Sequence, residues 1–125
     1  MILDTDVLIW FLRGNEKATK AVAEAIPFSV SIVTYMELVQ GMLNKKELSS
    51  MKKAFKTMGV NIIPVSEKIS LRAAEFVEKY SLSSSMELAD ALIASTCIEA
   101  KETLLTANNK HYNAIKEMKM KVFRP

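Results

Sequence analysis

The stretch that decides the fold is MILDTDVLIWFL, residues 1–12, where an apolar tripeptide is followed at once by acidic and hydroxyl residues. Residues 1–3 are too few and too apolar for a helix and predict a buried strand. The next three residues, Asp4, Thr5 and Asp6, each offer an oxygen that can cap a helix running to Leu12. The sequence therefore predicts a strand that passes directly into a helix, with an aspartate at the junction.

The same alternation continues along the chain. Apolar, β-branched segments predict further strands at 29–33, 60–65, 103–106 and 120–123. Amphipathic or capped segments predict helices at 15–25, 34–42, 46–58, 66–80, 86–100 and 108–117. Parallel neighbours need crossover connections, which helices supply, so the alternation predicts an α/β fold with a parallel sheet covered by helices on both faces.

Length and composition limit the class of protein. With 125 residues, half of them hydrophobic and a quarter charged, the chain fits one globular domain over residues 1–125. No apolar run reaches the roughly 18 residues of a membrane span, and the N-terminus carries no charged leader, so we expect no membrane insertion or export. The single cysteine, Cys97, has no disulfide partner, which favours a reducing cytoplasm.

The formal net charge of +3 is mildly basic. Lysines gather in residues 45–56, and further basic residues lie in 116–124. Each cluster alone is typical of a solvated helix face, so the charge permits a polyanionic partner without requiring one.

Asp4 and Glu37 are the first candidate functional residues. In an open α/β sheet, ligands bind beyond the carboxyl ends of the strands, and Asp4 lies at such a point. It is equally competent as a helix cap. A helical wheel places Glu37 away from the apolar stripe of its helix, beside Thr34 and Gly41, whose small size lets a ligand approach. An exposed glutamate is the alternative interpretation.

Asp90 is different because its helix is apolar almost all round. The wheel places it among Met86, Ile93 and Cys97. An unpaired carboxylate in such a place costs several kcal/mol, so Asp90 should meet a cation, gain hydrogen bonds or take up a proton. A divalent metal is the favoured partner, and a salt bridge to a Lys or Arg of another element is the alternative. Glu87, by contrast, has capping-box spacing within residues 84–87 and is expected to contact its own helix terminus.

Polar residues also follow the fourth predicted strand. Thr106 and Asn108 fall at the same sheet edge as Asp4 if the strands are parallel. Their neutral oxygens suit a metal-bound water or a phosphate, and Asn108 can also cap the next helix. His111, the only histidine, either contacts a phosphate or is an ordinary surface residue.

Three carboxylates from distant segments thus fall near one predicted edge. Hard oxygen ligands without His or Cys suit Mg²⁺ or Mn²⁺ better than zinc. Such a site can activate a water against a phosphodiester, with two ions roughly 4 Å apart if both bind. Hydrolysis of nucleic acid is the activity that these residues predict.

Four segments, residues 2–9, 31–41, 89–94 and 104–108, resemble those of PIN-domain ribonucleases, in particular the VapC-type toxins of prokaryotic toxin–antitoxin pairs. The resemblance implies a three-layer α/β/α sandwich with a central parallel sheet of four to five strands. It also implies endonucleolytic cleavage of RNA that leaves a 5′-phosphate, a homodimer, and a cognate antitoxin that blocks the acidic pocket.

The resemblance further implies Mg²⁺ or Mn²⁺ at Asp4, Glu37 and Asp90. Supporting or water-positioning roles would fall to Thr5, Asp6, Thr106 and Asn108. Two departures from the family pattern matter. Asn108 stands where many members carry a fourth acid, which leaves open whether one metal or two bind, and Asp6 stands where many have Asn.

Two other function classes remain in view. Residues 4–6 are similar to the paired aspartates of haloacid-dehalogenase-type phosphatases, but Leu8 departs from that motif and no acidic pair follows a late strand. A catalytically silent module that binds RNA or protein is the second alternative. The presence of all three acids favours the nuclease over it.

Overall fold

The computed structural model describes all 125 residues. Five strands form one parallel sheet in the order β3-β2-β1-β4-β5. The strands are β1 Ile2–Leu3, β2 Ser29–Ser31, β3 Asn61–Ile63, β4 Leu104–Thr106 and β5 Met120–Val122. The helices are α1 Thr5–Leu12, α2 Glu16–Ala25, α3 Ile32–Gln40, α4 Lys45–Met58, α5 Glu67–Tyr80 and α6 Leu88–Ala100, with a 3₁₀ turn η1 at Asn109–His111. None of the helices combines the length and apolar character that a membrane span requires.

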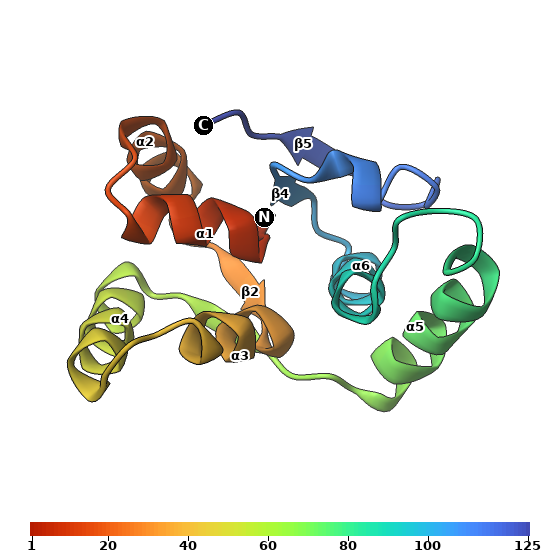
Figure 1. Cartoon of the computed structure of the whole chain (residues 1–125), viewed down its shortest axis with the longest axis horizontal. Helices are drawn as coiled ribbons and strands as arrows, with labels where there is room; N and C mark the ends of the chain where they lie inside the picture. The colour runs from red at the N-terminus through yellow and green to blue at the C-terminus, as the bar shows by residue number, and fades with distance from the viewer.

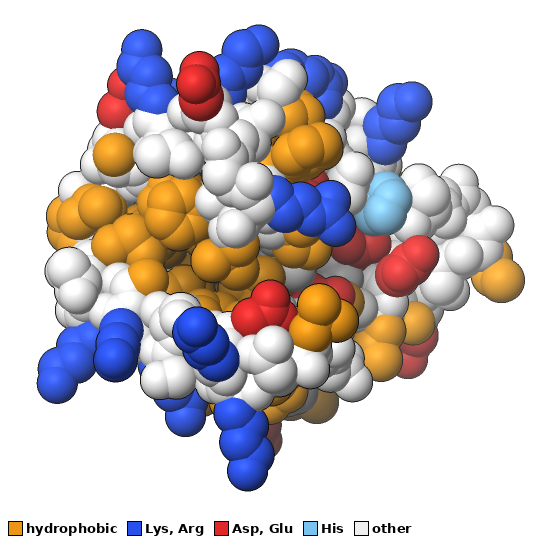
Figure 2. All heavy atoms as spheres, turned by 60° about the vertical axis from the view of Figure 1, so that its left-hand side comes forward, with side chains coloured by type: hydrophobic (Ala, Val, Ile, Leu, Met, Phe, Trp, Pro, Cys, Tyr) orange, Lys and Arg blue, Asp and Glu red, His pale blue; other side chains and the backbone are white.

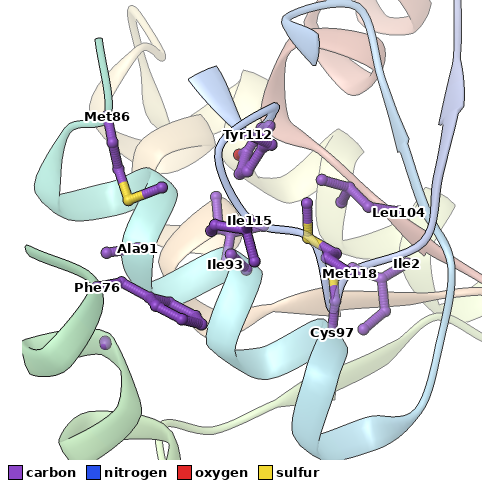
Figure 3. Close-up of a cluster of buried hydrophobic side chains, with 12 residues drawn as sticks. Ile2, Phe76, Met86, Ala91, Ile93, Cys97, Leu104, Tyr112, Ile115 and Met118 are labelled. Atoms are coloured by element: carbon purple, nitrogen blue, oxygen red, sulfur yellow. The ribbon is translucent and has the colours of Figure 1, made fainter. Parts of the chain in front are cut away.

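The sheet separates two hydrophobic cores, because neighbouring residues of a strand point to opposite faces. In β1, Ile2 and Leu3 are both fully buried but belong to different clusters. The cluster around Ile2 packs beneath α5 and α6 and is drawn in Figure 3. The cluster around Leu3 packs beneath α1, α2 and α4, which lie on the other side of the molecule in Figure 1. The α/β/α sandwich with a parallel sheet is therefore confirmed.

Several helix boundaries follow the local signals in the sequence. The Asn15 side chain accepts a hydrogen bond from the Ala18 N–H at the start of α2. The Ser66 side chain does the same for the Ile69 N–H at the start of α5. Gly59, at the end of α4, adopts a left-handed conformation with φ of 66°, which glycine reaches without steric cost.

The second strand is shorter than predicted. Residues 29–33 were expected to be extended, but β2 ends at Ser31 and α3 begins at Ile32. The Ser31 hydroxyl accepts a hydrogen bond from the Val33 N–H and so acts as the N-cap. A local cap therefore outweighs the strand preference of β-branched Ile32 and Val33.

The predicted helix over residues 108–117 is wrong. Only the three residues of η1 are helical, and turns follow them. The apolar side chains of Tyr112, Ile115 and Met118 all enter the core, and β5 starts two residues after Met118. The chain has to reach that core and return to the sheet within a few residues, which leaves no room for a regular helix.

Candidate active site

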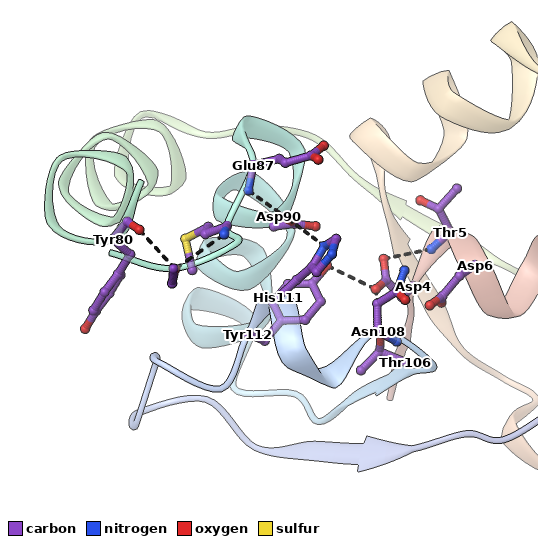
Figure 4. A network of polar contacts seen from close by, with 12 residues as sticks. Asp4, Thr5, Asp6, Tyr80, Glu87, Asp90, Thr106, Asn108, His111 and Tyr112 are labelled. Atoms are coloured by element: carbon purple, nitrogen blue, oxygen red, sulfur yellow. Dashed lines mark hydrogen bonds and ion pairs between the residues drawn. The ribbon is translucent and has the colours of Figure 1, made fainter. Parts of the chain in front are cut away.

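Asp4 is the centre of a polar network at the carboxyl end of β1 (Figure 4). It is 5% exposed, and its Oδ1 accepts a 2.8 Å hydrogen bond from the Thr5 N–H as the N-cap of α1. Its Oδ2 accepts hydrogen bonds from the Thr106 hydroxyl at 2.8 Å and the Tyr112 hydroxyl at 3.0 Å. The predicted cap is confirmed, and the same carboxylate is buried beside other acids.

The charged form of Asp4 is disfavoured in this environment. Burial, reinforced by the negative charge of Asp6, raises the pKa of Asp4 from 3.8 to about 7. The hydrogen bonds from Thr106, Thr5 and Tyr112 lower this pKa but do not offset the burial. A cation at this carboxylate would favour the charged form, so the local electrostatics suit a bound metal ion.

Asp6 ties α1 to the loop that follows β4. Its Oδ1 accepts a hydrogen bond from the Val7 N–H at 2.7 Å, and its Oδ2 accepts one from the Ala107 N–H at 3.0 Å. Burial raises the pKa of Asp6 as well. The Thr106 hydroxyl accepts a 2.9 Å hydrogen bond from the Asn108 N–H, so the loop after β4 is fixed beside Asp4. The Asn108 side chain does not cap η1.

Glu37 joins the network through Thr5. The Thr5 hydroxyl donates a 2.7 Å hydrogen bond to Glu37 Oε1 and lies 3.0 Å from the Thr34 hydroxyl. Thr5 thus contacts Glu37 with its side chain and Asp4 with its backbone. Glu37 is half-buried on α3, and its Oε2 makes no hydrogen bond within the chain.

Asp90 does have the partner that its apolar surroundings demand, but the partner is a histidine and not a Lys or Arg. The His111 Nδ1 lies 3.0 Å from Asp90 Oδ2, and the Asp90 side chain is 14% exposed. The same oxygen accepts a 2.9 Å hydrogen bond from the Glu87 N–H. Asp90 Oδ1 has no partner in the chain and remains available to a ligand.

Glu87 contacts its own helix terminus, as expected, but the residues of the capping box and the expectation for His111 need correction. The box was expected over residues 84–87, whereas α6 starts at Leu88, and Glu87 is the N-cap residue of a capping box with Asp90. Asp90, at the third helical position, accepts the hydrogen bond from the Glu87 backbone. His111 is neither isolated nor fully solvated, because it is half-buried against Asp90.

Tyr112 is the residue that the sequence reasoning missed. Its side chain is fully buried, and its hydroxyl donates to Asp4. Burial and the nearby charge of Asp4 raise the pKa of Tyr112, so the hydroxyl stays protonated and able to donate. The available signal was that a buried tyrosine hydroxyl needs a polar partner. Consecutive residues therefore hold two acids from different elements: His111 holds Asp90, and Tyr112 holds Asp4.

The network fits a hard divalent cation by donor type and charge. The donors are carboxylate oxygens, which Mg²⁺ and Mn²⁺ prefer, and the buried Asp4 lacks a compensating cation. The acids do not form a complete metal-coordination site, because no group of three His, Cys, Asp or Glu side chains is close enough to hold a metal ion. Asp90 is instead engaged by His111 and the Glu87 backbone.

A cleft of about 800 Å³ adjoins the network between α1, α3 and α4. Glu37 lines it together with apolar side chains, among them Phe11, Leu12, Met42 and Leu43. Leu12 and Leu43 are 45% and 87% exposed. Figure 2 shows the apolar surface of one face, hollowed in its middle and bordered by basic side chains.

The family assignment rests on nearly the whole chain. The family model described as PIN domain matches residues 1–117. The chain belongs to the PIN domain family. Among curated proteins, none matches this sequence.

Solved structures similar to this PIN domain include a toxin–antitoxin complex. A toxin–antitoxin complex from Klebsiella pneumoniae is 25% identical with a TM-score of 0.75, and the match covers 99% of this chain and 96% of that chain. FitAcB from Neisseria gonorrhoeae is 25% identical with a TM-score of 0.72, over 99% of this chain and 96% of that one. VapBC2 from Rickettsia felis, solved bound to a promoter DNA fragment, is 21% identical with a TM-score of 0.80 over 98% of each chain, which shows the fold alone. The resemblance to VapC-type PIN domains is therefore confirmed.

Proposed function

We propose that this PIN domain is a Mg²⁺- or Mn²⁺-dependent endoribonuclease with Asp4, Glu37 and Asp90 as its catalytic metal ligands. The observation that carries the proposal is the state of Asp4, a buried carboxylate whose pKa is raised to about 7 and which lacks a cation. Thr5 connects it to Glu37, and the His111–Tyr112 pair connects it to Asp90. Membership of a family whose members are generally nucleases supports the same activity.

Each acid has an oxygen suited to metal binding. Glu37 Oε2 and Asp90 Oδ1 make no hydrogen bond within the chain, and Asp4 Oδ1 accepts only the Thr5 backbone N–H. A bound Mg²⁺ or Mn²⁺ would activate water for attack on a phosphodiester and neutralise charge on the leaving oxygen.

The supporting residues act on these acids or beside them. Thr5 and Thr106 orient Glu37 and Asp4 by donating hydrogen bonds to one oxygen of each. Asp6 fixes the loop after β4 through the Ala107 N–H, and the exposed Asn108 at that loop is placed to contact substrate or water. Asn108 carries no charge, so a second metal would have fewer acidic ligands.

We further propose that the protein is the toxin of a type II toxin–antitoxin pair, acts in the cytoplasm as a single-domain homodimer, and is held by a cognate antitoxin. The similar Klebsiella structure, a toxin–antitoxin complex 25% identical to this chain, supports a partner of this kind. The apolar cleft that ends at Glu37 is suited to an amphipathic segment, which would cover the approach to the acids. Co-expression with a candidate antitoxin from the same genome should suppress cleavage, and the Leu43→Glu variant should escape that suppression.

The first experiment is cleavage of a labelled RNA panel with Mg²⁺, Mn²⁺ or EDTA. The variants are Asp4→Asn and Asp90→Asn, and Glu78→Gln, an exposed acid on α5, is the matched control. We expect metal-dependent cleavage by wild type and the control, and a loss of more than about 100-fold in the two site variants.

Two outcomes would contradict this function. Cleavage in EDTA, or cleavage unchanged in Asp4→Asn, would show that the acids do not act through a metal. Absence of wild-type cleavage across the panel, together with absence of metal binding by calorimetry, would favour the catalytically silent binding module. Two observations favour this second candidate: the acids do not form a complete metal-coordination site, and Asn108 is neutral.

A further inference from the structure

The C-terminal segment brings a basic side chain to the edge of the sheet that carries the acids. β5 runs parallel to β4, with Thr106 paired to Val122, and the Phe123 N–H donates a 2.8 Å hydrogen bond to the Thr106 carbonyl. The carboxyl ends of parallel strands lie at one edge, so Arg124 emerges at the same edge as Asp4. Arg124 lies beyond residues 1–117, which the family model matches.

The Arg124 guanidinium is held against the loop that also contacts the acids. Its Nη1 donates to the Ala107 carbonyl at 3.2 Å, and its Nη2 donates to Asn109 Oδ1 at 3.3 Å. The N–H of the same Ala107 donates to Asp6. One peptide segment therefore has the acidic site on one side and the guanidinium on the other.

The charge of Arg124 has no counter-ion in the chain. Both of its acceptors are neutral amide oxygens, and it takes part in none of the ion pairs of the structure. The side chain is exposed, and a guanidinium has five N–H donors, so several still point to solvent. This arrangement is the one that suits a bidentate contact with a phosphate.

The negative charge of the acids favours such a contact. A phosphodiester chain that reaches Asp4 and Asp90 brings its neighbouring phosphates close to carboxylates that repel them. A fixed cation at the rim removes part of this repulsion and fixes the register of the strand. Figure 2 shows basic and acidic side chains near the histidine on one face of the molecule.

We propose that Arg124 binds a backbone phosphate of RNA next to the phosphodiester that is cleaved. The inference rests on the proposed ribonuclease function and adds to it a substrate contact from the C-terminal segment. The contact is with the phosphate group and carries no base specificity. The residue therefore contributes to RNA affinity and register, and the metal site is independent of it.

A purely structural role predicts a different behaviour. If Arg124 only fastened the C-terminal segment to the loop after β4, its loss would lower thermal stability and leave the salt dependence of RNA binding unchanged. The two roles are separated by measuring the unfolding temperature together with RNA affinity.

The test measures the affinity of a fluorescently labelled single-stranded RNA in EDTA, where a metal-dependent enzyme does not cleave, at several salt concentrations. The variants are Arg124→Gln and Arg124→Lys, and the matched control is Lys119→Gln, which removes one exposed charge at the opposite end of β5. We expect Arg124→Gln to weaken binding roughly three- to tenfold and to reduce the slope of log affinity against log salt by about 0.7. Arg124→Lys should recover part of the affinity, and Lys119→Gln should resemble wild type.

Several results would overturn the Arg124 contact. These are an unchanged salt slope in Arg124→Gln, an equal loss in Lys119→Gln, or no measurable RNA binding by wild type. RNA cleavage with Mn²⁺, measured in parallel, separates this failure from failure of the proposed function. Wild-type cleavage with unaltered binding in Arg124→Gln rejects the contact alone, whereas Arg124-dependent binding without any cleavage rejects the nuclease and retains the contact.

Discussion

His111 Nδ1 and Asp90 Oδ2 lie 3.0 Å apart, and this contact joins the 3₁₀ turn η1 to the first turn of α6. The next residue, Tyr112, donates its hydroxyl to Asp4 on the neighbouring strand end. A short turn thereby positions two acids from different elements, Asp4 at the end of β1 and Asp90 on α6. Loss of a group that orients a metal ligand in this way typically lowers metal affinity by about 10- to 100-fold.

Loss of the His111 imidazole should weaken metal binding. We expect His111→Ala to lower Mn²⁺ affinity by about tenfold, because Asp90 then loses one of the two contacts that orient it. His111→Asn, whose amide nitrogen can replace Nδ1, should restore most of the affinity. Calorimetric titration with Mn²⁺ measures both. Equal affinity in wild type and His111→Ala would show that the His111 contact does not orient Asp90.

The pKa of Asp4 predicts how stability depends on pH. Between pH 3.8 and about pH 7, Asp4 of the native protein holds a proton that the unfolded chain has released. The free energy of unfolding therefore falls as pH rises through this window. We expect a fall on the order of 2 to 4 kcal/mol in wild type with EDTA, and a smaller one in Asp4→Asn. The rise in the pKa of Asp6 acts in the same direction and remains in that variant.

Urea denaturation from pH 4 to 8 measures this difference. In the control, Glu78→Gln, the unfolding free energy should change with pH as in wild type. Mn²⁺ should reduce the fall of unfolding free energy with pH in wild type, since a cation favours the charged carboxylate. Parallel pH profiles for wild type and Asp4→Asn would mean that Asp4 is not the titrating group.

Removal of the Tyr112 hydroxyl tests the hydrogen bond to Asp4. We expect Tyr112→Phe to cost about 1 kcal/mol of unfolding free energy, and more at pH 8 than at pH 5, because the hydroxyl favours the charged carboxylate. Tyr80→Phe is the matched control, since the Tyr80 hydroxyl has no hydrogen bond within the chain. Thermal unfolding at both pH values gives the comparison. An equal loss at both pH values would indicate a packing effect only.

Two glycines provide a test of backbone conformation. Gly59 has φ of 66°, whereas Gly41 has φ of −82°, and a Cβ added at Gly41 would meet its nearest atom at 3.6 Å. We expect Gly59→Ala to destabilise the protein by about 1 kcal/mol and Gly41→Ala to be neutral or slightly stabilising. Denaturant unfolding of both variants gives the answer. Similar effects of the two substitutions would contradict the role of the left-handed conformation.

Local signals in the sequence were sufficient for most of the fold. The N-caps Asp4, Asn15 and Ser66 and the terminator Gly59 act within a few residues of themselves, so the sequence shows them directly. The alternation of short apolar segments with amphipathic ones determined the parallel sheet, because parallel strands need crossovers. The ends of the strands and helices were less well predicted where a helix cap competes with the strand preference of β-branched residues, as at Ser31.

The candidate site was only partly predictable. The position of Asp4 at a strand end and of Asp90 on an apolar helix could be recognised from the sequence, and the need of Asp90 for a partner followed from the cost of burying a charge. The identity of that partner, His111, could not, because residues 108–117 looked helical and their path across the core depends on contacts with distant residues.

What the sequence by itself determined is the order of the strands and of helices α1 to α6, several of the helix caps, and the type of acid placed at each candidate position. Only the tertiary structure decided that Tyr112 and Thr106 share one oxygen of Asp4 and that Arg124 lies against the loop beside Asp6. Asp4 is separated from Tyr112 by 108 residues along the chain and from Thr106 by 102. Hydrogen bonds over such separations leave no periodic or local pattern, because they exist only after the strands have paired and brought their carboxyl ends to one edge.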